Sequence, residues 1–284
     1  MKLHTIETGK FKLDGGAMYG VVPKQMWENI NPPDDNNMCT WAMRCMLIET
    51  ADKKILVDTG IGNKQSDKFR SHFEPHGEDD LLSSLSKVGC SAEDITDVFL
   101  THLHFDHCGG AIKHDEEGNP VPTFPNATYW SNQKHWDWAM NPNPRERASF
   151  LKENMVPLKD WGILKMVETK HGEEWLPGIR VKYYNGHTEA MMALQIDTGE
   201  KTILYNADLL PSYGHIGLPY VMAYDIRPLV SMKEKEEMLK DALAQNHVLY
   251  FEHDPVVECA TLKLNKRGRI VMDQAFRLDE VIGR

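Results

Sequence analysis

The sequence has no long hydrophobic run, few cysteines and a deficit of basic residues. No apolar stretch approaches the roughly 20 residues that cross a bilayer, and the N-terminus lacks the apolar core of a secretion signal. The five cysteines form no C-x-x-C pair, so a disulfide framework is not expected. Lys and Arg total 32 against 42 Asp and Glu, and the net charge of -10 provides no basic face for nucleic acid or an anionic membrane. We therefore expect a cytoplasmic protein with neither of these partners.

The hydrophobic pattern predicts an α/β protein. With 284 residues, 41% of them hydrophobic, the chain can bury a large core as one domain or as two packed halves. Expected strands cover 40–49, 55–57, 97–100, 179–184, 191–196, 202–205 and 247–251, with a hairpin over 261–272. Expected helices cover 78–88, 231–245 and 273–282, and a helical insertion lies near 142–161. This order favours a four-layer αββα sandwich in a single domain, residues 1–284, with halves near 1–140 and 165–284.

Residues 101–107, Thr-His-Leu-His-Phe-Asp-His, place three imidazoles and a carboxylate within six residues. His102 and His104 are two positions apart, so in an extended backbone both rings leave the same side and can hold one metal ion. Asp106 and His107 follow at once, which requires the chain to bend and to direct a second ligand pair at a neighbouring point. The alternative, a solvated histidine-rich turn, does not account for a spacing that fits two coordination spheres.

Four further polar residues each lie within a few positions of the end of an apolar strand. They are Asp58, His187, Asp208 and His253. Any one of them alone is as often a capping or surface residue, whereas the four together repeat one context and would complete two coordination spheres. Cys108, next to the cluster, is either a weak ligand or, as we favour, a thiol packed behind the site.

On these residues the chain resembles the metallo-β-lactamase-fold hydrolases. The family's His-x-His-x-Asp-His signature corresponds to residues 102–107, and the later ligands follow in the family's order. The resemblance covers about 40–253 and implies an αββα sandwich with two metal ions at one edge. The implied ligands are His102, His104 and His187 for one ion, Asp106, His107 and His253 for the second, and Asp208 as a bridge.

The implied chemistry is hydrolysis by a hydroxide that two divalent ions share. Two cations about 3.5–4 Å apart lower the pKa of a bound water toward ~7 and polarise the oxygen on which charge develops. Asp106 or Asp208 is then placed to pass the proton to the leaving group. Asp58 is expected either to orient a ligand imidazole or to stabilise a turn. Mixed imidazole and carboxylate ligands suit zinc best, with manganese, iron or cobalt as alternatives.

Within the family, several features bear on the substrate. The acidic balance disfavours the nucleases, His104 in place of a glutamate disfavours the oxygen-reducing diiron branch, and Asp208 disfavours true β-lactamases. Residues 206–215 and 16–20 are similar to the branch of N-acyl-homoserine lactonases and methyl-parathion-hydrolase-like enzymes. Known lactonases of that branch carry a substrate-contacting tyrosine three residues after the bridging aspartate, where this chain has Pro211.

We therefore predict a metal-dependent hydrolase of a small ester or lactone, with N-acyl-homoserine lactones as candidate substrates. Phosphotriester hydrolysis and thioester hydrolysis of the glyoxalase II type are the alternatives, and the complete ligand set disfavours a non-catalytic metal-binding protein. Tyr19, Tyr213 and His215 are candidate substrate contacts, against the alternative of core or loop packing. The sequence leaves the formation of a homo-oligomer open.

Overall fold

The chain forms two compact units in the computed structural model, which describes residues 1–281. Unit 1 combines Met1–Lys10 with Met43–Glu168. Unit 2 combines Phe11–Ala42 with the chain from Thr169 onward. Residues 11–42 therefore pack with the second half of the sequence, whereas the sequence pattern groups them with the first. The organisation of the chain as a single domain stays a prediction.

Unit 1 is built on a sheet whose strands run in the order β1-β2-β3-β4-β7-β8. The strands are β1 (Lys2–Asp14), β2 (Met38–Glu49), β3 (Lys54–Val57), β4 (Asp97–Phe99), β7 (Thr128–Ser131) and β8 (Leu164–Met166). The C-terminal end of β1, from residue 11, and the N-terminal end of β2, up to residue 42, belong to unit 2. The strands from β3 to β8 in this order are parallel to their neighbours. Parallel strands end at one edge of a sheet, so the loops that follow β3 and β4 start beside each other.

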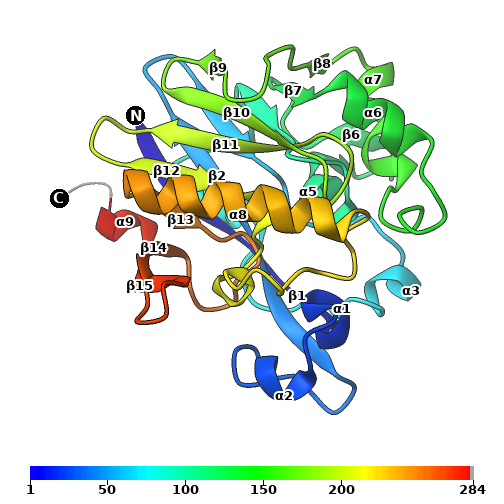
Figure 1. The fold of residues 1–284 in the computed structure, drawn as a ribbon. Coiled ribbons are helices and arrows are strands. Elements are labelled where there is room, and N and C mark those ends of the chain that lie inside the picture. The colour runs from blue at the N-terminus through cyan, green and yellow to red at the C-terminus, as the bar shows by residue number, and fades with distance from the viewer. Residues whose placement is uncertain (282–284) are drawn as a thin grey trace. The chain divides into compact units, whose positions relative to one another are not determined.

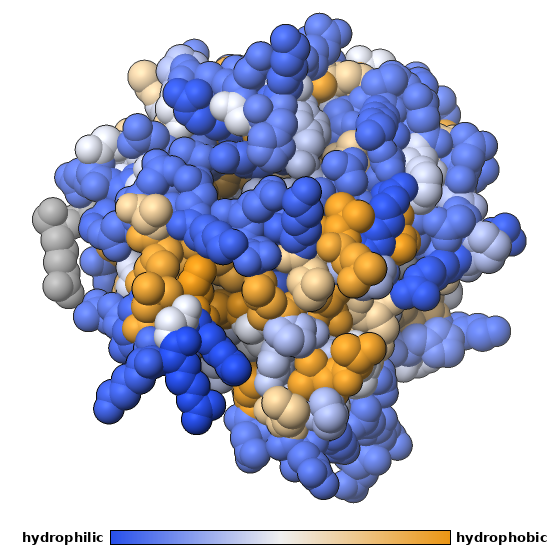
Figure 2. Space-filling view, viewed as in Figure 1, coloured by the Kyte–Doolittle hydropathy of each residue, from blue (hydrophilic) through white to orange (hydrophobic). Residues whose placement is uncertain are grey.

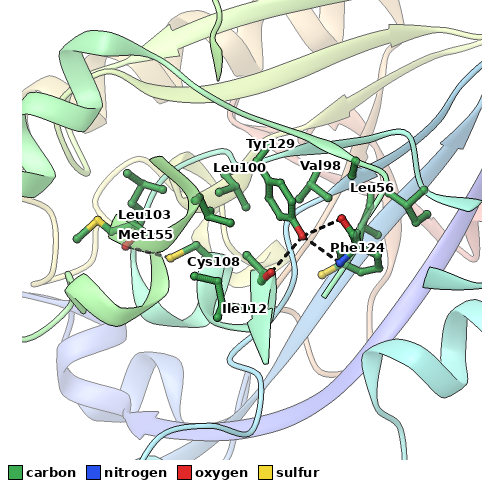
Figure 3. Close-up of a cluster of buried hydrophobic side chains, with 14 of the residues drawn as sticks. Leu56, Val98, Leu100, Leu103, Cys108, Ile112, Phe124, Tyr129 and Met155 are labelled. Atoms are coloured by element: carbon green, nitrogen blue, oxygen red, sulfur yellow. Dashed lines mark hydrogen bonds between the residues drawn. The ribbon is translucent and has the colours of Figure 1, made fainter. Parts of the chain in front are cut away.

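The core of unit 1 is a cluster of buried apolar side chains (Figure 3). Leu56, Val98 and Leu100 come from the central strands and their ends and are fully buried. The Tyr129 hydroxyl forms two hydrogen bonds within this core, since it accepts from the Phe124 amide at 3.0 Å and donates to the Ala111 carbonyl at 3.1 Å. The other elements of unit 1 are α3 (Asp67–Arg70), α4 (Leu81–Lys87), α5 (Phe105–Cys108), β5 (Ile112–His114), β6 (Pro120–Pro122), α6 (Gln133–Met140) and α7 (Val156–Asp160).

Unit 2 is built on a sheet with the strand order β15-β14-β13-β12-β11-β10-β9. The strands are β9 (Glu174–Leu176), β10 (Ile179–Tyr184), β11 (Met191–Asp197), β12 (Thr202–Tyr205), β13 (Val248–Tyr250), β14 (Cys259–Leu264) and β15 (Ile270–Phe276). Figure 1 shows the long helix α8 (Pro228–Gln245) lying along one face of this sheet. It buries Met238, Leu239 and Ala242. The short helices α1 (Gly15–Tyr19), α2 (Lys24–Trp27) and α9 (Leu278–Val281) complete the unit.

Most expected strands and the helices expected over 78–88 and 231–245 are confirmed, whereas the last helix is shorter than expected and the insertion is only partly helical. Residues 273–276 extend β15, and the last helix starts only at Leu278. Helix α8 begins at Pro228, which suits a first helical turn because its missing N–H needs no partner there. The insertion near 142–161 is mostly turns, with helical structure only over Lys152–Asn154 and Val156–Asp160. Residues 15–19 form helix α1, whose first turn is capped by the Asp14 side chain.

Figure 2 shows a largely hydrophilic face on which apolar side chains gather below α8 and around β14. The five cysteines are free and buried, which confirms that the protein has no disulfide framework. Within residues 1–281, no helix combines the length and the apolar character needed to cross a membrane.

Candidate metal centre

The ligand cluster of unit 1 lies in the loop that follows β4. His102 and His104 stand on extended backbone, and Asp106 and His107 lie on the short helix α5. The centroid of the His102 ring lies 4.5 Å from that of His104 and 3.9 Å from that of His107. All four side chains are buried. The predicted bend therefore exists. It brings the imidazoles of His104 and His107, which are two and five positions after His102, close to the His102 ring.

Asp58, at the end of β3, holds this loop in place. Its carboxylate accepts the Thr101 amide at 2.8 Å, the Thr101 hydroxyl at 2.7 Å and Nδ1–H of His107 at 3.1 Å. Because the Thr101 hydroxyl donates to Asp58, its oxygen accepts Nδ1–H of His102 at 3.1 Å. The carboxylate and the hydroxyl thus fix two imidazoles with Nδ1 protonated, which leaves the Nε2 lone pair of each ring for a metal ion.

Two residues of unit 1 that the sequence pattern did not single out also touch the cluster. His135, fully buried on α6, accepts the amide of Leu103 through Nε2 at 2.9 Å and so supports the backbone between His102 and His104. Glu146, from the inserted segment, places Oε1 3.7 Å from Nε2 of His104. His135 lies inside helix α6 and Glu146 inside the inserted segment, so neither has the strand-end position that identified the other candidates.

Cys108 lies behind the loop. Its thiol donates to the Leu103 carbonyl at 3.4 Å, and burial raises the pKa of the thiol to about 12. A thiol that keeps its proton is a poor metal ligand. Between the two alternatives for this residue, the structure supports structural packing.

Unit 2 supplies a second cluster around one carboxylate. Asp208 Oδ2 lies 3.1 Å from Nε2 of His187, and Asp208 Oδ1 lies 3.0 Å from Nε2 of His253. All three side chains are buried, and each follows a strand of the sheet, β10, β12 or β13. Each oxygen of Asp208 therefore approaches a different imidazole.

The other nitrogen of each imidazole in unit 2 is already bonded. His187 donates Nδ1–H to Asp225 at 2.9 Å, and His253 donates Nδ1–H to the Ala42 carbonyl at 2.7 Å. In the neutral rings that metal binding requires, the Nε2 lone pairs face the oxygens of Asp208, and this arrangement is repulsive unless a cation lies between them. Two ligand atoms that are each about 2.0–2.2 Å from one zinc ion lie roughly 3–3.5 Å apart, as these do. The residues present therefore fit a divalent metal.

The electrostatics of His187 lead to the same conclusion. Burial lowers the pKa of His187, but the Asp208 and Asp225 carboxylates outweigh burial and raise the pKa to about 10. The site therefore attracts positive charge. Glu234 on α8 orders the backbone just before His187, because its carboxylate accepts the amides of Asn185 at 2.9 Å and Gly186 at 3.0 Å.

We expect Asp225→Asn to weaken zinc binding by about 10- to 100-fold, because the variant no longer fixes the tautomer of His187 through a charged acceptor. Competition with a chromophoric chelator measures the affinity. Asp197→Asn is the matched control, since it removes the same charge from an exposed strand end. Equal zinc affinity in both variants would contradict the role of Asp225.

The three candidate substrate contacts all lie in unit 2, and two of them are buried. Tyr19 stacks on Trp27 and on His215, with ring centroids 5.1 Å and 4.9 Å apart. His215 donates Nε2–H to the Met18 carbonyl at 2.9 Å and accepts the Ser212 hydroxyl through Nδ1 at 2.7 Å. Both ring nitrogens of His215 are thus engaged within the unit. Tyr213 is half-buried, and its amide donates to Asp254 at 3.0 Å.

His215 should make the protein sensitive to mild acid. Burial lowers the pKa of His215 to about 3, whereas in the unfolded chain the pKa is near 6.5. Between about pH 3 and pH 6.5 the imidazole of His215 is protonated in the unfolded state but not in the folded state. The free energy of unfolding therefore falls as the pH drops below 6.5. We expect the free energy of unfolding of the wild type to fall more steeply between pH 6.5 and 5 than that of His215→Gln, by up to about 1.4 kcal/mol per pH unit. Urea titrations at each pH test this, and parallel slopes would refute it.

The fold and these clusters define a metal-dependent hydrolase. The model of the metallo-β-lactamase superfamily matches residues 44–253, so the chain belongs to this superfamily. The predicted α/β class and metallo-β-lactamase fold are confirmed.

Similar proteins include several lactonases. The N-acyl homoserine lactonase AiiA of Bacillus thuringiensis subsp. kurstaki is 24% identical over 266 residues, which cover 89% of this chain and 93% of that protein. A probable metallo-hydrolase of Mycobacterium tuberculosis is 25% identical over 243 residues and covers 76% of this chain and 73% of its own length.

Solved structures agree with this fold over nearly the whole chain. A probable metal-dependent hydrolase from Staphylococcus aureus has a TM-score of 0.84 and 28% identity, covering 97% of this chain and 98% of that one. AidC, a dizinc quorum-quenching lactonase, has a TM-score of 0.77 at 21% identity and covers 96% of this chain and 94% of its own.

Proposed function

We propose that this hydrolase is dinuclear and opens a small lactone or ester, with N-acyl-homoserine lactones as the first substrates to test. The proposed ligands are His102, His104 and His187 for one ion, Asp106, His107 and His253 for the other, and Asp208 for both. Zinc is the proposed metal, since its preferred donors are imidazole and carboxylate. The substrate is then a neutral small molecule, in keeping with the net charge of -10, which disfavours polyanions.

Asp208 is the observation that carries this proposal. A carboxylate whose oxygens lie 3.1 and 3.0 Å from two different imidazoles is arranged as a bridge between two ligand sets. A single-ion site would need only one of those oxygens. The Nδ1 partners of His187 and His253 support the same interpretation, because with Nδ1–H bonded each ring directs Nε2 toward Asp208.

Different residues have different proposed roles in the reaction. When bound, a pair of divalent ions supplies an acidified water and an electrophile for the developing negative charge. Asp58, Asp225 and the Ala42 carbonyl keep the ligand imidazoles in one tautomer. Asp106 and Asp208 are the carboxylates proposed to take the proton of the attacking water and to return it to the leaving oxygen. Tyr19 and Tyr213 remain proposed substrate contacts.

The lactone class is favoured over the alternatives by the relatives. AiiA is an N-acyl homoserine lactonase, and AidC is a lactonase seen with N-hexanoyl-L-homoserine. Their low identity to this chain leaves room for another ester, a phosphotriester or a thioester. A comparison of substrates at equal metal loading therefore decides the class.

The test compares N-hexanoyl-homoserine lactone, a phosphotriester and a glutathione thioester with protein of known zinc content. We expect the lactone to be turned over with the highest kcat/KM, activity to vanish with a chelator, and two equivalents of zinc to restore it. A preference of more than about tenfold for either other substrate would reassign the class. Full activity with one equivalent of zinc would refute the dinuclear mechanism.

A further inference from the structure

Unit 2 contains a cavity of about 190 Å³, and the proposed substrate contacts Tyr19 and Tyr213 form part of its lining. Its lining comes from four separate segments of the unit. Tyr19, Ile30 and Trp41 come from the N-terminal part, Ser212 and Tyr213 from the loop after β12, Asp254 to Val257 from the loop after β13, and Met272 from β15. An apolar cavity of about 150 Å³ is enough to hold benzene. This cavity therefore has room for a ring or a short alkyl chain.

Two buried polar atoms belong to residues that line the cavity. Within residues 1–281, neither the indole Nε1–H of Trp41 nor the hydroxyl of Tyr19 forms a hydrogen bond. Both side chains are fully buried, so bulk water does not solvate them. The Ser212 hydroxyl, which bonds to Nδ1 of His215 at 2.7 Å, lies close enough to the Tyr19 hydroxyl to offset part of the rise that burial causes in the pKa of Tyr19, but not in the geometry of a normal hydrogen bond. An unsatisfied buried donor costs about 1–3 kcal/mol, which a ligand oxygen can recover.

The phenol of Tyr19 is held in one position. Its ring is sandwiched between Trp27, at an interplanar angle of 16°, and His215, at 6°. Gly214 packs so closely that a Cβ there would lie 3.0 Å from the Tyr19 hydroxyl. The ring therefore cannot turn away, and the position of the hydroxyl oxygen is set before a ligand arrives.

The lining favours an uncharged ligand. None of the residues that form it is basic. Asp254 is the acidic residue of the lining, and its carboxylate accepts the amides of Tyr213, Val256 and Val257 at 3.0, 3.0 and 2.6 Å. Most of the remaining surface is aliphatic or aromatic. Val256 is 83% exposed, which places one residue of the rim in solvent.

We propose that this cavity is a binding site for a small uncharged group that is mostly apolar, about the size of a benzene ring, and carries one carbonyl-type oxygen. The oxygen accepts Nε1–H of Trp41 and the hydroxyl of Tyr19, and the apolar part lies against the aliphatic lining. The group is either a free molecule or one arm of the hydrolase substrate. The proposal depends only on the geometry of unit 2 and not on the metal assignment.

Acetophenone and ethylbenzene are a suitable pair of probes, because they share the ring and differ in the carbonyl oxygen. We expect acetophenone to bind the whole protein roughly 10-fold more tightly than ethylbenzene, as measured by NMR titration of tryptophan and methyl signals. Tyr19→Phe and Trp41→Phe should each reduce this preference, and a crystal soaked with acetophenone should show its oxygen at both donors. Zinc-loaded and chelated protein should give the same affinities, which separates this test from that of the lactonase.

A cavity-filling variant tests whether the probes bind in this cavity or elsewhere on the protein. Val257→Phe should abolish binding of both probes, whereas Val21→Phe, the same change at a residue that is 91% exposed, should leave binding unchanged. The proposal is overturned if the two probes bind equally, if Tyr19→Phe and Trp41→Phe keep the full preference, or if the soaked crystal shows only ordered water. Competitive inhibition of ester hydrolysis by acetophenone would assign the cavity to the substrate, and binding without inhibition would assign it to a separate molecule.

Discussion

Asp208→Asn should lower kcat by at least about 100-fold while the protein keeps most of its metal. An amide has one oxygen that can act as a ligand and one NH₂ group that cannot, so one of the two contacts at 3.1 and 3.0 Å is lost. The second contact and the other ligands should still hold zinc, but the two ions would no longer share a charged bridge. Elemental analysis together with steady-state kinetics on the lactone separates these two effects.

Asp197→Asn serves as the control for this variant too, because it makes the same change at an exposed position. Equal melting temperatures of both variants would show that a loss of activity is not a loss of folding. If Asp208→Asn kept wild-type kcat, the bridging role would have to move to another carboxylate. Asp106 would then be the first residue to test.

His104→Ala should reduce the zinc content from two ions per chain toward one. The substitution removes one imidazole from the ligand set proposed for the first ion, and a zinc site with too few protein ligands binds weakly. It also removes the group that faces Glu146 at 3.7 Å and leaves a buried carboxylate near empty space. Turnover should fall with the metal content, and added zinc in the millimolar range should restore it in part.

His114→Ala is the matched control, since this histidine is exposed on β5 in the same unit. It should keep two zinc ions and full activity. Full zinc occupancy in His104→Ala after dialysis against metal-free buffer would exclude His104 as a ligand.

The prediction of strands from the sequence succeeded where apolar runs were short and bounded by turns. Strands β3 and β4 are examples, because their side chains are almost entirely buried and leave a continuous apolar signal. The first strand, β1, was missed, because its buried positions recur mostly every third residue and not every second. This strand lacks the regular alternation of apolar and polar side chains by which a half-buried strand is predicted from a sequence.

Glu234 illustrates how a correct local motif can serve another purpose. Ser231 and Glu234 have the spacing of a capping box, which predicts a helix start. In the structure Ser231 is buried inside α8, and Glu234 binds two backbone amides that precede His187, almost 50 residues earlier in the chain. The nearest available donors in space, and not the motif, decided which groups the carboxylate bonds.

The sequence alone determined the residue types and the strand-end positions of the candidate ligands, because a polar residue directly after an apolar strand is a local pattern. The tertiary structure decided which group bonds to Nδ1 of each imidazole. The Nδ1 partners of His187 and His253 are Asp225 and the Ala42 carbonyl, 38 and 211 positions away in the chain. Contacts between such distant residues arise only when the folded chain brings them to hydrogen-bond distance, and no local pattern of sequence encodes them.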